Sequence, residues 1–195
     1  NGRVCNGPQA AQPVDLRTGL FFHEWSDLAI KDVAPLDLTR TYRSDDSTSH
    51  DFVIGSSSNF GVHLYSADGF TTPQLVMPCG EGIAFHLISG TADWPLTGTV
   101  WQHRDTDSAF YGATLQFLLD ATPDGAHWIL NTKDGTQYAF TRHAPNSLSW
   151  IKDRYGNQLR MTYNGGLLDQ VVSPSGRSLT FAHDSKNRVQ SVVDN

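Results

Sequence analysis

Hydrophobic and polar residues alternate with a period of two along much of this chain, a pattern typical of strands that bury one face. The alternation is clearest at 35–44, where Leu36, Leu38, Arg40 and Tyr42 are expected on one side of a strand. No segment keeps an apolar period of 3.6 residues over three turns, so the pattern predicts an all-β protein. Shorter alternating segments lie at 60–66, 72–78, 82–88, 114–120, 127–132 and 137–142.

Two longer stretches interrupt the alternation and are predicted to be irregular. Residues 43–59 are polar and rich in serine, and residues 89–112 show no clear period. The first residues, 1–14, contain Gly, Pro and Asn and are also predicted to be irregular. Asp-Gly pairs at 124–125 and 134–135 predict tight turns between strands.

A repeat near the C-terminal end is the strongest regularity. The stretch DRYGNQLRMTYNGG at 153–166 returns in degraded form twenty residues later as SPSGRSLTFAHDS at 173–185, and an earlier copy, DGTQYAFTR, precedes it by 21 residues. Each copy has a turn glycine, an alternating strand, a hairpin turn (Asn164-Gly165 in one copy, 184–187 in the next) and a return strand. The repeat positions are Gly135, Gly156, Leu159, Met161, Tyr163, Gly176, Leu179, Phe181 and His183.

Such a repeat has a physical reason. A single two-stranded hairpin is only marginally stable because it cannot bury its apolar face. Hairpins that stack edge to edge satisfy each other's open backbone groups and extend one sheet. We therefore predict antiparallel β-hairpin repeats with an open strand edge, through which the chain self-associates or pairs with a companion segment. Along the sequence we expect a leading segment at 1–34, a β module at 35–125 and about three hairpin repeats at 126–195.

Composition narrows the range of partners. The net charge of −6 and the absence of a Lys/Arg cluster argue against nucleic-acid binding. The sequence contains no run of about 18 apolar residues, the length that a membrane-spanning helix requires. The first residue is Asn rather than Met, so we expect a fragment or a processed product. Cys5 and Cys79 can form a disulfide if the protein matures outside the cytosol, or stay as two thiols, and the sequence leaves both open.

Catalytic and metal-binding motifs find little support. The segment HEWSD at 23–27 half resembles HExxH, but Asp27 stands where the second histidine is needed and the context is not helical. We interpret it as a surface strand with its polar residues outward. Eight histidines are scattered without ligand spacing. We therefore predict no catalytic residue, no metal site and no cofactor, and hence a protein that is not an enzyme.

Large rings raise a second hypothesis. The tryptophans Trp94, Trp101, Trp128 and Trp150 are candidates for exposed rings, but Trp150 precedes the turn of a repeat and is expected to pack between strands instead. Exposed rings on a sheet can stack on sugars. The alternative to a purely structural role is therefore a surface β module that binds a glycan or a partner protein.

The repeats resemble the YD repeats of Rhs-type and teneurin-like proteins, in which a Tyr-Asp pair is followed by Gly-Arg-Leu. Tyr163-Asn164 and His183-Asp184 stand where Tyr-Asp would stand, and 187–189 stands where Gly-Arg-Leu would, although no copy carries the full pair. The upstream blocks are similar to the module that precedes the repeats in bacterial Rhs proteins. These blocks are PVDLRTGLF at 13–21, SDLAI at 26–30, PLDLTRTYRS at 35–44 and GEGIAFHL at 80–87.

This resemblance implies both a fold and a role. In the family, the repeats wind as a spiralling β-sheet into a hollow shell that encloses a C-terminal toxin domain until delivery, often by type VI secretion. The chain would then be a non-catalytic part of the shell of a polymorphic toxin used in interbacterial competition. Its partners would be the remaining shell, the enclosed toxin domain, and a secretion-apparatus component or chaperone. It would be a secreted or delivered bacterial effector, assembled in the cytoplasm before export.

Overall fold

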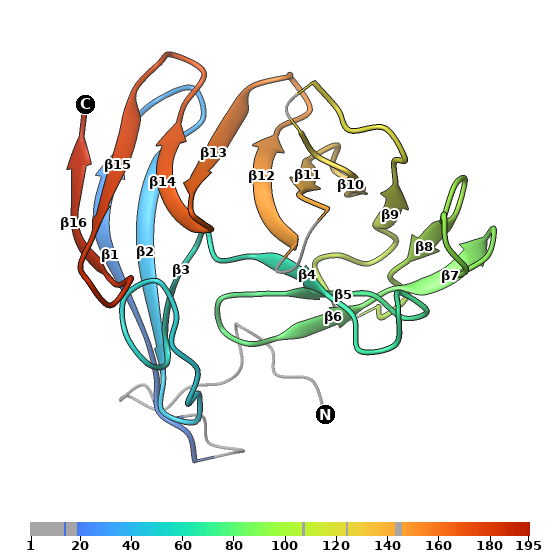
Figure 1. The fold of residues 1–195 in the computed structure, drawn as a ribbon, viewed down its shortest axis with the longest axis horizontal. Helices are drawn as coiled ribbons and strands as arrows, with labels where there is room; N and C mark the ends of the chain where they lie inside the picture. The colour runs from blue at the N-terminus through green and yellow to red at the C-terminus, as the bar shows by residue number, and fades with distance from the viewer. Residues whose placement is uncertain (1–13, 15–18, 107, 124, 143–145) are drawn as a thin grey trace. The chain divides into compact units, whose positions relative to one another are not determined.

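The structure is a computed structural model, and it describes residue 14 and residues 19–106, 108–123, 125–142 and 146–195 (Figure 1). These residues form strands that pair antiparallel, and they form no helix, which confirms the predicted all-β class. Within the same ranges, no helix has the length and apolar character that a membrane span requires.

The chain divides into two compact units, and each consists of segments from different parts of the sequence. The segment boundaries expected at 34/35 and 125/126 stay predictions. The first unit contains 1–61, 77–81 and 160–195, and the second contains 62–76 and 82–159.

The first unit contains a three-stranded sheet and a meander of consecutive hairpins. The sheet has the order β1 (Phe22–Ile30), β2 (Leu36–Arg43), β3 (Ser56–Ser58). The meander has the order β13 (Gln158–Asn164), β14 (Leu167–Val172), β15 (Ser178–His183), β16 (Val189–Asp194), and the first two residues of β13 belong to the second unit. Phe60 and Phe181 meet edge to face in the core of this unit, with ring centroids 6.5 Å apart.

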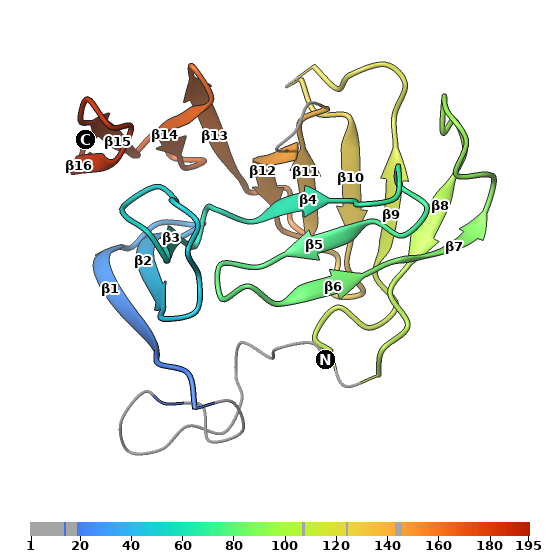
Figure 2. The same ribbon diagram turned by 60° about the horizontal axis from the view of Figure 1, so that its bottom comes forward.

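The second unit contains a meander of six strands, β7 to β12, and a smaller group of three. In the smaller group, β4, β5 and β6 pair side by side (Figure 2). The small group joins the meander where Asn146 of β12 pairs with Leu64 of β4. Trp101 and Trp128 are fully buried in the core of this unit, with ring centroids 5.7 Å apart. The strand bounds are β4 (His63–Tyr65), β5 (Gln74–Val76), β6 (Gly82–Ala84), β7 (His86–Ser89), β8 (Val100–Gln102), β9 (Thr114–Phe117), β10 (Trp128–Asn131), β11 (Gln137–Phe140) and β12 (Asn146–Lys152).

Six turns share one hydrogen-bonding pattern. The first residue of each turn donates its N–H to the carbonyl of the fifth, and the fourth donates back to the carbonyl of the first. The fourth residue has a positive φ, which glycine adopts without a steric penalty. It is glycine in five turns and Asn187 in the sixth. The turns are 77–81, 122–126, 132–136, 153–157, 173–177 and 184–188.

Three hairpins share a bulge in the second, or return, strand: β11–β12, β13–β14 and β15–β16. The strand register skips one residue in each return strand: Ser149 of β12, Asp169 of β14 and Gln190 of β16. They recur at intervals of 20 and 21 residues. Each bulge strengthens the local twist and re-aims the residues beyond it.

In each hairpin, an aromatic residue of the first strand pairs with the aliphatic residue that immediately precedes the bulge in the return strand. Phe140 occupies in the earliest copy the position that Tyr163 occupies in the next. It follows its turn glycine, Gly135, by five residues, whereas Tyr163 follows Gly156 by seven, because β11 is shorter than β13. The pairs are Phe140 with Leu148, Tyr163 with Leu168, and His183 with Val189.

The serine-rich stretch predicted as a loop contains a strand. Residues 56–58 form β3 and pair with β2. Serine has little strand propensity of its own. Here the hydroxyls are buried and find partners, because Ser57 donates to the carbonyl of Pro78 (2.9 Å) and Ser58 donates to the Asp51 carboxylate (2.9 Å).

Two further strand predictions were wrong in detail. The stretch 89–112 contains β8, a strand of three residues that is too short to reveal a period. The single strand predicted at 82–88 is divided into β6 and β7 on either side of Phe85. As a result, Leu87 does not share the buried side of Ile83 and Phe85 but is 39% exposed.

The hairpin turn predicted at Asn164-Gly165 lies one residue further on. Asn164 pairs with Leu167, and the two loop residues are Gly165 and Gly166, with φ of 59° and 85°. A two-residue hairpin loop with positive φ at both positions favours this glycine pair. The turn at 184–188 is of the five-residue kind, so the two turns are not equivalent.

Candidate functional site

The predicted repeat positions occupy corresponding points of the hairpins. Gly135, Gly156 and Gly176 are the fourth residues of their turns, with φ of 90°, 90° and 92°. Burial raises the pKa of Tyr163, and the negative charge of Asp51 raises it further. Met161, Leu179 and Phe181 are buried, whereas Leu159, Tyr163 and His183 are half-buried.

The predicted cysteine pair falls partly outside the structure, because Cys5 lies outside the described residues. Cys79 is buried, and its carbonyl accepts a hydrogen bond of 3.2 Å from the Arg43 guanidinium. The possible disulfide between Cys5 and Cys79 stays a prediction.

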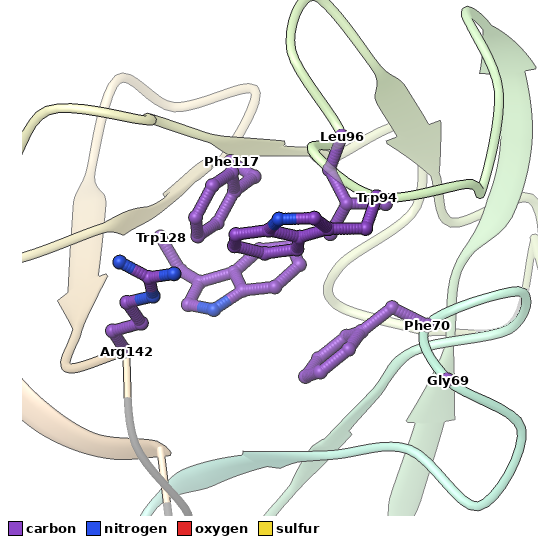
Figure 3. A pocket seen from close by; sticks show the side chains of 7 residues that line it. All are labelled: Gly69, Phe70, Trp94, Leu96, Phe117, Trp128 and Arg142. Atoms are coloured by element: carbon purple, nitrogen blue, oxygen red, sulfur yellow. The ribbon is translucent and has the colours of Figure 1, made fainter.

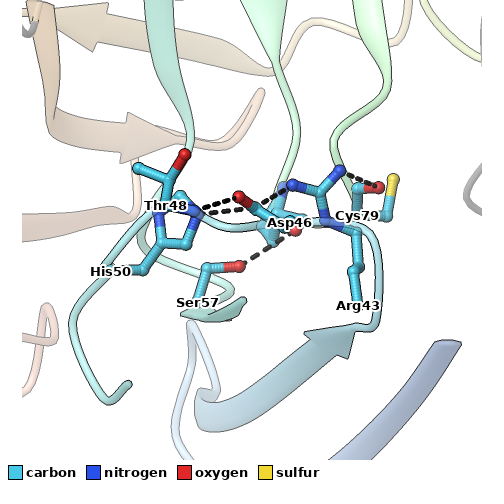
Figure 4. Close-up of polar contacts among 7 residues, drawn as sticks. Arg43, Asp46, Thr48, His50, Ser57 and Cys79 are labelled. Carbon is cyan, nitrogen blue, oxygen red and sulfur yellow. Dashed lines mark hydrogen bonds and ion pairs between the residues drawn. The ribbon is translucent and has the colours of Figure 1, made fainter. Parts of the chain in front are cut away.

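A charged cluster anchors the loop between β2 and β3 (Figure 4). The Asp46 carboxylate contacts the Arg43 guanidinium, the His50 ring (2.6 Å) and the backbone N–H of Thr48 (2.9 Å). Burial alone would raise the pKa of Asp46, but the hydrogen bonds from Thr48, His50 and Arg43 outweigh it and hold this pKa well below its usual range. The Arg43 guanidinium also donates to the carbonyl of Cys79, so the cluster ties this loop to a second segment of the first unit and stabilises the structure.

The segment HEWSD lies on β1, and most of its side chains are exposed, which confirms the surface-strand interpretation. Asp27 accepts two hydrogen bonds from the Arg40 guanidinium, at 2.5 and 2.8 Å. His23 meets the edge of Trp25, with ring centroids 4.2 Å apart. Across the part of the chain that the structure describes, no three His, Cys, Asp or Glu residues gather as metal ligands.

Of the four tryptophans considered as surface rings, three are buried. Trp101, Trp128 and Trp150 are 0%, 1% and 5% exposed, whereas Trp94 is 59% exposed. The expectation of exposure was wrong for Trp101 and Trp128, whereas the packing of Trp150 between strands was expected. All three rings lie on inward-facing strand positions, where large apolar surfaces contribute most to the core. Among these four tryptophans, Trp94, which lies in a loop, presents its ring to solvent.

Trp94 covers a cleft in the second unit with a volume of about 400 Å³ (Figure 3). Phe117 and Trp128 form its buried floor, with ring centroids 4.9 Å apart. The Trp94 ring lies 5.4 Å from the Phe117 ring, and the Phe70 ring stacks on Trp128 at 4.4 Å. We call this site the aromatic cleft; it is lined by Gly69, Phe70, Trp94, Leu96, Phe117, Trp128 and Arg142.

The floor of the aromatic cleft comes from paired strands. Phe117 ends β9, Trp128 begins β10, and the two are direct neighbours in the strand register. His127 stacks on Phe117 and donates a hydrogen bond of 2.9 Å to the carbonyl of Leu118 when protonated at Nδ1. The floor is therefore rigid.

The walls come from two loops with unusual backbones. Phe70 and Leu96 have φ of 69° and 61°, and with Asn187 they are the non-glycine residues in the left-handed region among the described residues. Phe70 is held by a hydrogen bond of 2.8 Å from its N–H to the Ser66 hydroxyl. Leu96 is held at both ends, by the carbonyl of Asp93 (3.0 Å) and the N–H of Thr99 (3.1 Å).

Arg142 supplies the positive charge of the aromatic cleft. Its guanidinium lies 4.8 Å from the centre of the Trp94 ring. Within the described residues it forms no hydrogen bond and no ion pair. Trp94 was a candidate from the sequence, but Phe70, Leu96 and Arg142 were not, because no local pattern connects three loops that the fold brings together.

One family matches part of the chain. A family described as a domain of unknown function (DUF6531) matches residues 11–85, the stretch that contains β1 to β6. The match includes the block at 35–44 on which the upstream resemblance rests. No curated protein matches the chain significantly.

Proposed function

We propose that this chain is a non-catalytic structural segment of an Rhs-type β-shell that encloses a C-terminal toxin domain and helps to deliver it in interbacterial competition. The wall is made by backbone pairing between successive hairpins, so its function is enclosure rather than chemistry. The remaining shell and the enclosed domain are its partners, and a secretion-apparatus component or chaperone receives the assembled protein before export.

The recurrence of one hairpin geometry is the observation that carries this proposal. The turn glycines Gly135, Gly156 and Gly176 share nearly the same φ, and each return strand carries a bulge at an equivalent position. A bulge at a constant interval gives each hairpin the same added twist. A sheet with a regular twist increment curves steadily, which is what a closed wall requires.

The upstream region adds support. The match to DUF6531 covers the region whose sequence blocks resemble the module that precedes the repeats in bacterial Rhs proteins. Two parts of this region, 11–61 and 77–81, belong to the same compact unit as residues 160–195, which contain most of the hairpins β13 to β16. A capping module beside the first repeats would protect a sheet edge from pairing with other chains.

Electron microscopy of the gene product at its full encoded length tests the proposal. We expect the hairpins from β11 to β16 to continue into a wall around an interior volume that holds a separate domain. A solid β domain without an interior would contradict it.

A protease-protection assay on the same protein gives an independent readout. Gly176→Val places a β-branched residue at φ 92° in a repeat turn and should increase cleavage of the enclosed domain. Gly98→Val, at φ 72° in a loop outside the repeats, is the matched control and should leave the enclosed domain protected.

A further inference from the structure

The aromatic cleft has features that enclosure does not use. It presents a half-exposed ring, Trp94, and a half-buried ring, Phe70, above a rigid apolar floor. An exposed large ring beside an apolar cleft retains surface that a ligand can remove from water. The volume of about 400 Å³ is of the size that binds a small molecule or one large side chain.

The polar groups of the cleft narrow the chemistry of this ligand. Among the described lining residues, the polar side-chain groups are the Arg142 guanidinium and the indole N–H groups, all of which are donors. Sugar hydroxyls use acceptors as well as donors, and a neutral sugar would find no side-chain acceptor among the described lining residues. A carboxylate needs donors alone, and guanidinium is the side chain that matches it best.

The cation and the rings are placed to act together. Arg142 lies over one part of the Trp94 ring, and Figure 3 shows Phe70 on the other side of the Trp94 and Trp128 rings. A flat apolar group can contact the rings while a carboxylate at its end reaches the guanidinium. Arg142 forms no ion pair within the described residues, so a ligand carboxylate would displace no carboxylate among them.

The strained loops point the same way. Phe70 and Leu96 hold backbone conformations that cost free energy for residues with a Cβ, and both side chains line the aromatic cleft. Strain of this kind persists where surrounding contacts fix it, and it concentrates at binding sites.

From these observations we propose that the aromatic cleft is a binding site for an aromatic group that carries a carboxylate. Two sources share this chemistry: a free aromatic acid, and a peptide in which an aromatic side chain stands beside an acidic one. The inference does not depend on the enclosure proposed above, because it rests only on residues of the second unit.

Nuclear magnetic resonance titration of the ¹⁵N-labelled chain tests the proposal, with cinnamate as the probe. The indole N–H signal of Trp94, identified by its loss in Trp94→Phe, should shift on addition of cinnamate. Cinnamyl alcohol, which has the same ring without the charge, should bind at least tenfold more weakly. Equal binding of the alcohol, or no shift of the Trp94 signal with cinnamate or with the acidic peptide described below, would overturn the proposal.

Variants assign the effect to the charge and to the rings. Arg142→Gln should weaken cinnamate binding about tenfold, because it removes a charge-assisted hydrogen bond. Arg104→Gln is the matched control, since Arg104 is exposed in the same unit but does not line the cleft, and it should leave the affinity unchanged. Phe70→Ala should also weaken binding. Unchanged affinity in Arg142→Gln would overturn the proposal even if the rings bind.

A second arm of the titration separates the two sources. The capped dipeptide acetyl-Phe-Glu-amide is compared with acetyl-Phe-Gln-amide, which lacks the charge. If the acidic peptide binds more tightly than cinnamate, the ligand is a polypeptide segment; if cinnamate binds more tightly, it is a free acid. Either result supports a site for an aromatic carboxylate, whereas tighter binding of the neutral peptide contradicts it.

Discussion

The repeat turns and the loops of the aromatic cleft place residues in the same left-handed backbone region by different means. In the turns, the positive φ belongs to glycine or, at one position, to Asn187, residues that adopt it at little cost. In the cleft it belongs to Phe70 and Leu96, which do not adopt it on their own. The turns are therefore specified locally, whereas the cleft loops are held by the surrounding fold. This contrast separates scaffold from candidate site.

The largest effect is expected at Leu96, where the usual order of two substitutions should be reversed. Leu96→Ala removes a buried side chain and should cost about 3 kcal/mol of unfolding free energy. Leu96→Gly removes the same contacts but relieves the backbone at φ 61°, so it should be no less stable than the alanine variant. Urea unfolding followed by tryptophan fluorescence measures both.

The control for this prediction is Leu115, a fully buried residue of β9 with ordinary backbone geometry. There the glycine variant should be about 1 kcal/mol less stable than the alanine variant, because glycine loses more chain entropy on folding. If Leu96 shows the same order as Leu115, the backbone at Leu96 is not strained and the contrast between turns and cleft fails.

The next largest effect compares two turn glycines. Gly135 and Gly156 share φ 90°, but a Cβ on Gly135 would lie 2.8 Å from the Cβ of Arg154, whereas a Cβ on Gly156 would meet nothing within 4 Å. Gly156→Ala should cost about 1 kcal/mol from the backbone alone. Gly135→Ala should cost about 2–3 kcal/mol, because crowding is added. Equal losses of stability in urea unfolding would show that the turns differ from the geometry described.

A smaller effect is expected in the charged cluster, which holds its loop by side chains rather than by turn residues. Asp46→Asn should cost about 1–2 kcal/mol at pH 7, because it removes a carboxylate that accepts charge-assisted hydrogen bonds. The folded state lowers the pKa of Asp46, so its stabilisation is present above the unfolded pKa of about 3.9 and is lost as the pH falls further toward the folded value.

Urea unfolding of both proteins between pH 7 and pH 2 measures this dependence. The difference between wild type and Asp46→Asn should be constant at neutral pH and should begin to shrink near pH 4. A difference that grows on acidification would have the wrong sign for a carboxylate with a lowered pKa and would exclude the cluster as the cause.

The smallest effect is expected at Asn187, the turn position without glycine. Asn187→Gly should change the unfolding free energy by less than about 0.5 kcal/mol, because both residues adopt φ 62° readily. Asn187→Ala should cost about 1 kcal/mol of unfolding free energy, because alanine does not readily adopt a positive φ. Thermal unfolding resolves the pair, and an alanine variant as stable as the glycine variant would show that the turn opens in solution.

Local pattern predicted the strands and turns best where several residues agree. The alternation at 158–163 and 178–183 predicted β13 and β15, and the glycines predicted their turns. It failed at Ser56–Ser58, whose strand exists because β2 and the partners of the hydroxyls are present. It also failed at Trp101, because three residues are too few to show which face is buried.

The aromatic cleft was beyond the reach of such reasoning. Phe70, Trp94 and Arg142 are separated by 24 and 48 residues, and no spacing rule connects them. The tryptophans were candidates for ligand binding from the sequence, but whether a ring lies in the core or at the surface depends on strand pairing. Trp128 and Trp94 show both outcomes within one site.

By itself the sequence determined the all-β fold class, the repeating hairpins and the glycines of their turns, because these depend on interactions between residues close together in the chain. Only the tertiary structure decided which tryptophan stays exposed, which residues hold a left-handed backbone without glycine, and where a cation meets the rings. Those features depend on contacts between distant segments, whose free energy exists only after the chain has folded.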